Sequence, residues 1–248
     1  MRARIRYSSA PHRETLFEGV LHPIVILCNL GVAAWFFPSW QTARVQWVPG
    51  LDSLWRTVEN RSTPIIYYTW HAYELLAACA FRDVRRDLWP TAIGHDGLAS
   101  RVLQHAMVWF GFSLWVYRRR SPWQPKQQLI DLLRREPQSI LALFPDSGGP
   151  DGEVRPGLVE VARETGALLV PIAVRACPVL IVGSSRRYGL PLPFCTVTAF
   201  HGDPVDGRVA TRQAIQKALE EQDNRARRIG EPEADRCTQA NKSLERTR

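Results

Sequence analysis

The feature that most constrains the fold of this chain is an alternation of short apolar segments with amphipathic ones, which begins after residue 60. Six of the apolar segments are typical of strands: residues 64–70, 91–93, 113–116, 139–144, 168–174 and 195–200. Strands that alternate with helices form βα units. We therefore expect an α/β fold in which helices flank one largely parallel central sheet.

Capping and breaking residues mark the expected helices. Asp96 can cap a helix whose apolar positions recur at helical spacing until Gly111. Residues 125–135 repeat the pattern, and Pro156 opens a further helix that Gly166 ends. Each helix separates two of the expected strands, as a βα arrangement requires.

The chain is expected to form one domain with a tail at each end. Its 248 residues, 45% of them hydrophobic, can bury a core without disulfides. We assign residues 61–229 to the α/β domain, whose last helix runs from 210 to about 228. Residues 230–248 are polar and lack a period, so we expect a disordered tail. Residues 1–60 are expected to be an apolar, membrane-associating segment.

That N-terminal assignment depends on residues 21–37, which are mostly apolar. They are fewer than the roughly 20 residues that span a bilayer, and nearby tryptophans favour the membrane interface. We expect an apolar helix lying in the plane of a membrane or inserted shallowly, on the cytoplasmic face of the inner membrane. A secretory signal peptide, which the preceding arginines would suit, and a buried core helix are the alternatives.

Charge and cysteine usage limit the partners and the compartment. The formal net charge of +8 favours an anionic partner: a membrane surface, a phosphorylated substrate, coenzyme A or nucleic acid. The five cysteines lack paired spacing, so they indicate neither a disulfide framework nor a zinc cage. A reducing, cytoplasm-facing location follows. His95 and His105 lack the spacing of metal ligands, so we expect no metal.

Two strand ends carry residues suited to chemistry. His71 ends the 64–70 strand, and Asp146-Ser147-Gly148-Gly149-Pro150 follows the 139–144 strand. Reactive groups in open α/β sheets gather where strands end, so one site is expected here. Gly148 and Gly149 lack side chains, and their N–H groups could face a phosphate or a thioester oxyanion. A plain glycine turn is the alternative.

Four ordered motifs between about Pro64 and Asp206 resemble the lysophospholipid, or glycerolipid, acyltransferase superfamily, and most closely a bacterial branch described as a domain of unknown function. They are Trp70-His71, Asp96-Gly97, the Asp146–Pro150 loop followed by Pro156-Gly157, and Pro191-Leu192-Pro193-Phe194. The resemblance implies a glycerolipid acyltransferase-like fold. It also implies transfer of an acyl group from coenzyme A or acyl carrier protein, as co-substrate and without a further cofactor, to a lipid hydroxyl.

The resemblance makes His71 the general base, since a neutral imidazole suits removal of a hydroxyl proton. Superfamily members usually place an Asp five positions after the His, where this chain has Leu76. Glu74 shares a helix face with His71 and could orient its ring instead. Asp96 is the second candidate, with a simple helix N-cap as its alternative role.

Substrate-binding residues are expected in three places. The first is the loop that contains Asp146, Ser147, Gly148 and Gly149. The second is Arg155, the nearest basic residue to that loop, and the third is the arginine run at 118–121. Arg118, Arg119, Arg120 and Ser121 follow the 113–116 strand, where three guanidiniums could bind lipid or coenzyme phosphates. Arginine runs are also common on solvated surfaces.

Two other functions compete with a peripheral membrane acyltransferase. A catalytically degenerate member of the same fold would bind lipid or acyl donor without turnover. Leu76 would suit it, and so would the Asp146–Pro150 loop, which lacks the Arg that related loops commonly carry inside this motif. A nucleic-acid-binding domain would explain the charge, but no recognition motif accompanies it. The acceptor lipid, the acyl chain length and the oligomeric state are left open by the sequence.

Overall fold

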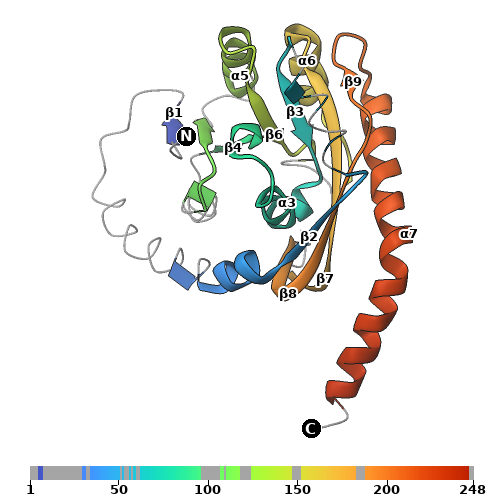
Figure 1. Ribbon diagram of the computed structural model, residues 1–248. Coiled ribbons are helices and arrows are strands. Elements are labelled where there is room, and N and C mark those ends of the chain that lie inside the picture. The colour runs from blue at the N-terminus through green and yellow to red at the C-terminus, as the bar shows by residue number, and fades with distance from the viewer. Residues whose placement is uncertain are drawn as a thin grey trace.

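The computed structural model describes residues 5–7, 30–31, 34–50, 52, 56, 58–59, 62–95, 107–108, 110–117, 124–146, 152–182 and 188–245. Within them the strands form one sheet in the order β1-β5-β4-β6-β3-β7-β8-β2, with β9 paired to β7 (Figure 1). The strands are β1 (Ile5–Tyr7), β2 (Arg44–Val48), β3 (Ile65–Tyr68), β4 (Thr91–His95), β5 (Leu114–Tyr117), β6 (Ile140–Leu143), β7 (Leu168–Val182), β8 (Tyr188–His201) and β9 (Val205–Asp206).

Most strand pairs are parallel, so the expectation of a mixed α/β fold around one largely parallel sheet is confirmed. β3 lies between β6 and β7 and is parallel to both. The exceptions are β8 and β9, which pair with β7 in antiparallel fashion. All six strands expected from the sequence are present. β1 and β2, which were not expected, add residues before position 61 to the sheet.

β7 is longer than the sequence indicates. It continues to Val182 rather than ending near Val174, and with β8 it forms a long hairpin. Pro178 interrupts the apolar pattern, and it has no backbone N–H to donate to a neighbouring strand. In the sequence it therefore indicates the end of a strand. The hairpin accommodates it with a register shift between Cys177 and Val179.

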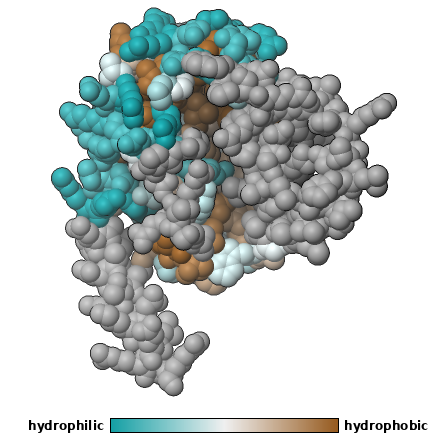
Figure 2. All heavy atoms as spheres, turned by 180° about the vertical axis from the view of Figure 1, so that it is seen from behind, coloured by the Kyte–Doolittle hydropathy of each residue, from teal (hydrophilic) through white to brown (hydrophobic). Residues whose placement is uncertain are grey.

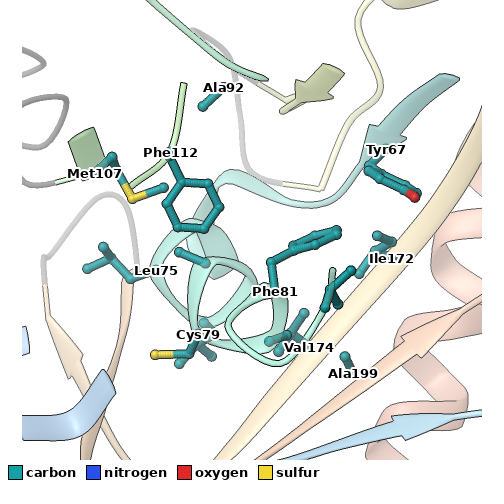
Figure 3. Packing of buried hydrophobic residues seen from close by; sticks show 14 of the residues in the cluster. Tyr67, Leu75, Cys79, Phe81, Ala92, Met107, Phe112, Ile172, Val174 and Ala199 are labelled. Carbon is teal, nitrogen blue, oxygen red and sulfur yellow. The ribbon is translucent and has the colours of Figure 1, made fainter. Parts of the chain in front are cut away.

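Helices cover both faces of the sheet because alternate strand residues are apolar on both sides. Ile65 and Tyr67 pack on one face with α3 (Glu74–Phe81), and Figure 3 shows Phe81 of α3 among the side chains of this cluster. Ile66 and Tyr68 pack on the other face, in the cluster that also contains side chains of α5 (Gln124–Arg135), α6 (Pro156–Thr165) and α7 (Arg212–Glu245). The site at the end of β3 therefore stands on a strand buried on both sides.

Helix ends follow the expected signals where the structure describes them. Gly166 follows α6 with a φ of 63°, the left-handed conformation that a helix C-cap requires. The expected helix over 125–135 is α5. The helix expected from Asp96 falls largely outside the described residues. α7 continues as helix to Glu245, past Gly230, where the sequence predicts regular structure to end; this stretch is rich in helix-forming residues although it lacks an apolar period.

The N-terminal prediction is only partly covered. Residues 34–42 are helical, and Phe36 and Trp40 are buried in the cluster on the α3 face. Most of the 21–37 segment lies outside the described residues. In the part of the chain that the structure describes, none of the helices has the length and apolar content needed to cross a bilayer.

The described cysteine side chains differ in state. Cys79 of α3 and Cys195 of β8 are free and buried. Cys177 of β7 is disulfide-bonded. The spacing of cysteines along the sequence does not indicate this bond, because a disulfide depends on proximity in the fold rather than on spacing in the chain.

Candidate active site

His71 and Asp146 meet at the carboxyl edge of the sheet. The parallel register pairs Tyr68 of β3 with Leu143 of β6, and each functional residue stands three positions further along its chain. The backbone N–H of His71 donates to Oδ1 of Asp146, with an N···O distance of 3.0 Å. Asp146 is buried, so this bond holds the start of the turn that carries the imidazole. The expectation that the two strand ends form one site agrees with this geometry.

Glu74 faces the imidazole of His71. His71 lies in a short 3-10 helix, η1 (His71–Tyr73), which leads directly into α3 with Glu74 as its first residue. Nδ1 of His71 and Oε2 of Glu74 are 3.4 Å apart, at i,i+3 spacing. Burial raises the pKa of Glu74 to about 8. A carboxyl group that changes protonation near neutral pH thus contacts one nitrogen of the imidazole.

Two aromatic rings flank the imidazole. Phe144, which follows β6, has its ring centroid 5.0 Å from that of His71, and Tyr188 of β8 lies at 5.3 Å. The side chain of His71 is 23% exposed. Packing against these two rings holds the imidazole in place, and the carboxyl group of Glu74 lies on its Nδ1 side.

A cavity of about 420 Å³ lies beside His71. Trp70 and Ala72, the neighbours of His71 in sequence, line it together with Asp146, although the imidazole itself does not. Its wall is part aliphatic and part charged, with side chains from β7 and α7. A volume of this size falls in the range of small-molecule sites.

Leu76 occupies the position where the family resemblance implies an Asp. It is buried, it lines the cavity, and a Cβ built on Gly189 would lie 3.0 Å from its Cδ1. A carboxylate held that closely under the β8 backbone would lose its hydration. The apolar residue suits this packing, and Glu74, two residues earlier, presents a carboxyl group to the imidazole.

The structure brings together some of the expected site residues. His71, Glu74 and Asp146 form one group. The backbone N–H of Arg155 donates to the carbonyl of Pro145 at 2.8 Å, which places the backbone of Arg155 next to the turn that carries Asp146. The other candidates lie outside the residues whose side chains the structure describes; they are Asp96, Ser147, Gly148, Gly149, Arg118, Arg119, Arg120 and Ser121.

Sequence reasoning missed the charged residues of the cavity. Arg175 on β7, and Asp223 and Arg227 on α7, form ion pairs on its wall. The i,i+4 spacing of Asp223 and Arg227 is a signal that could have been noticed. Their meeting with Arg175 depends on how α7 packs on β7, which no local pattern contains.

The fold and the site define a mixed α/β protein with a histidine–carboxyl pair at the carboxyl edge of its sheet. No protein-family model matches the chain, and the search of curated proteins found no match either. Among the described side chains, no three His, Cys, Asp or Glu residues are grouped so that they could hold a metal ion. The function must therefore be argued from the site.

Proposed function

We propose that the protein is an acyltransferase that moves a fatty acyl group from a thioester of coenzyme A or acyl carrier protein to a hydroxyl of a lysophospholipid or related glycolipid. The observation that carries the proposal is the placement of His71 beyond β3, with its Nδ1 beside Glu74 and its backbone held by Asp146 from β6. The resemblance of the sequence motifs to glycerolipid acyltransferases gives the reaction class and the finer fold assignment.

The proposed mechanism uses both nitrogens of the imidazole. When Glu74 is ionised, it accepts Nδ1–H, and Nε2 is then the basic nitrogen. Nε2 takes the proton of the acceptor hydroxyl as the oxygen attacks the thioester carbonyl. A C–O bond forms, the C–S bond breaks, and the imidazolium returns the proton to the leaving thiolate. Glu74 touches no substrate in this scheme and is a positioning residue.

Exposed apolar side chains support action at a membrane surface. The helix over 34–42 and the β7–β8 hairpin contribute most of them, and Figure 2 shows hydrophobic side chains gathered at the lower end of the molecule. The N–H of Phe194 donates to Oγ1 of Thr42 at 2.8 Å, which joins the hairpin to that helix. The exposed apolar residues are Trp35, Phe37, Leu180, Ile181 and Phe194 of these two elements, together with Leu30. We call them the apolar edge.

A lipid- or acyl-donor-binding protein without turnover is the second candidate. The observation that favours it is that the imidazole of His71 does not line the neighbouring cavity, while Leu76 does. Under this alternative the cavity would hold an acyl chain or lipid, and His71 would be structural.

The test is an acyl-transfer assay on membranes from cells expressing the protein. Lysophospholipid and lipid A-type acceptors are scanned with radiolabelled acyl-coenzyme A and acyl carrier protein donors. The proposal expects a labelled product that depends on the wild-type chain and identifies both acceptor and donor. Binding of lipid without any product, in protein that is folded and membrane-associated, would favour the second candidate.

A further inference from the structure

Four side chains form a charged cluster on the wall of the cavity beside His71; we call Tyr73, Arg175, Asp223 and Arg227 the arginine cluster. Asp223 accepts from Nη2 of Arg175 at 2.6 Å, from Nε of Arg227 at 3.1 Å and from the hydroxyl of Tyr73 at 3.1 Å. The guanidinium of Arg175 also lies over the Tyr73 ring, 5.0 Å from its centroid. Burial raises the pKa of Tyr73 to about 12, so its hydroxyl keeps its proton as a donor.

The cluster has donors and positive charge beyond what Asp223 satisfies. Within the cluster two guanidiniums face one carboxylate, so the cluster carries one positive charge more than Asp223 neutralises. The other carboxylate of the cavity wall, Asp146, is outside the cluster and accepts from the backbone N–H of His71. Nε of Arg175 is buried and has no hydrogen-bond partner among the described residues. A buried N–H donor without a partner is costly, and an anionic oxygen in the cavity would satisfy it.

The rest of the cavity wall has the opposite character. Leu76, Val174, Val179 and Ile181 line it and give the cavity an aliphatic side. A site with a cationic part and an aliphatic part matches an amphiphile whose headgroup is anionic. Guanidinium groups bind phosphate with two parallel hydrogen bonds, which favours a phosphate headgroup.

We infer that the arginine cluster and the aliphatic wall together form a binding site for a phosphate monoester that carries an alkyl chain. This inference rests on the proposed function, for which such a molecule is the phosphorylated acyl acceptor. Trp70, Ala72 and Asp146 also line the cavity, which places the bound headgroup in the neighbourhood of His71. Arg175 belongs to β7 and Arg227 to α7, so neither is among the substrate-binding residues expected from the sequence.

Calorimetric titration of the full-length protein tests the site with three probes: dodecyl phosphate below its micelle concentration, inorganic phosphate, and 1-lauroylglycerol as a neutral amphiphile. Arg175→Gln and Arg227→Gln should each weaken dodecyl phosphate binding about tenfold or more, the effect of losing a charge-assisted hydrogen bond. Binding of 1-lauroylglycerol should be unchanged. Inorganic phosphate should bind more weakly than dodecyl phosphate, because it gains nothing from the aliphatic wall.

Two variants separate ligand binding from a structural role of the cluster. Arg228→Gln removes a neighbouring exposed charge of α7 that does not line the cavity, and it should bind dodecyl phosphate like the wild type. Asp223→Asn removes the competing carboxylate, so binding should be as tight or tighter. If the cluster only fastened α7 to β7, Asp223→Asn would lower affinity together with the arginine variants.

The outcomes also distinguish this site from the proposed reaction. Binding is measured in the His71→Ala background as well, where it should persist because no turnover is required. If dodecyl phosphate binds in an arginine-dependent way but no acyl transfer is found, the result supports the binding site and contradicts the proposed acyltransferase function. Two results would contradict the proposed binding site, with or without acyl transfer. One is dodecyl phosphate affinity at the wild-type level in both Arg175→Gln and Arg227→Gln, and the other is equal affinity for inorganic phosphate and dodecyl phosphate.

Discussion

Oε2 of Glu74 lies 3.4 Å from Nδ1 of His71, although the family resemblance would place the orienting carboxylate two residues later. The turn from η1 into α3 makes this contact, because residues three apart share one face of a helix. The carboxyl group is buried, and its pKa is raised to about 8. Together these facts tie the basicity of the imidazole to the protonation of Glu74.

Replacing Glu74 with Gln should lower acyl transfer without unfolding the protein. The amide can still contact Nδ1 but cannot supply the negative charge that stabilises an imidazolium during proton transfer. We expect the rate constant of transfer to fall about 10- to 100-fold, less than the roughly 100- to 10,000-fold that general base catalysis contributes, because His71 itself remains. The measurement is steady-state kinetics, with Glu221→Gln, an exposed change on α7, as the control. Equal loss in both variants would contradict a specific role for Glu74.

The rate of transfer should rise with pH through about 8. Below this value Glu74 is protonated, and its hydroxyl can donate to Nδ1, which leaves the proton of the ring on Nε2. Deprotonation of the pair frees Nε2 to act as base. A pH–rate profile of the wild type should show this ascending limb, and the limb should move in Glu74→Gln. A profile that is the same in both proteins would exclude Glu74 as the titrating partner.

Asp146→Ala should destabilise the fold at the site. The backbone N–H of His71 would lose its buried acceptor, which costs about 1–3 kcal/mol. Urea denaturation measures the free energy of unfolding, and Asp203→Ala, at an exposed position, is the matched control and should change it little. If the two variants had equal stability, the hydrogen bond to His71 would not hold the turn.

Two glycines, one near the start of α6 and one just after its end, should respond to alanine in opposite directions. Gly166 has a φ of 63°, and its added Cβ would lie 3.1 Å from Nε of Arg208, so Gly166→Ala should cost about 1–2 kcal/mol. Gly157 lies inside the helix with nothing near its missing Cβ, so Gly157→Ala should stabilise by up to about 1 kcal/mol. Thermal melts of the two variants check the sign of each effect.

Phe194→Ser should weaken membrane binding while leaving the fold intact. Phe194 is 80% exposed on the apolar edge, and insertion of its ring into lipid would contribute about 1.5–3 kcal/mol. Flotation with liposomes of anionic phospholipid should show binding weaker by about tenfold or more. Val209→Ser is the control, because Val209 is also exposed but follows β9, which pairs with the opposite end of β7. If Phe194→Ser floats with liposomes as the wild type does, the β7–β8 hairpin does not contact the membrane surface through Phe194.

Sequence patterns were sufficient for the framework of the fold because the signals are local. The six expected strands and the helices α5 and α6 follow from apolar periods and from breakers such as Gly166. β2 was missed because it lies in a segment whose tryptophans suggest a membrane interface, and Trp47 instead packs against Phe81. The far end of β7 was missed because Pro178 looks like the end of a strand.

The contacts of the candidate site also fall into those that local sequence patterns predict and those that depend on tertiary packing. The contact of His71 with Glu74 could be predicted, since it depends on helical spacing alone, and the meeting with Asp146 followed from the geometry of strand ends. Tyr188 and Arg175 could not be predicted, because they reach the site through the long hairpin and the packing of α7. Asp96, the glycines at 148 and 149 and the 118–121 segment stay predictions.

The most direct measurement is a radiolabelled acyl-transfer assay with purified wild-type and His71→Ala proteins, using the acceptor and donor identified on membranes. Circular dichroism and flotation first establish that both proteins are folded and bind membranes equally. The account predicts product with the wild type and a loss of at least about 100-fold in His71→Ala, as expected for removal of a general base. Equal product from the two proteins would contradict the role of His71, and with it the mechanism proposed for this site.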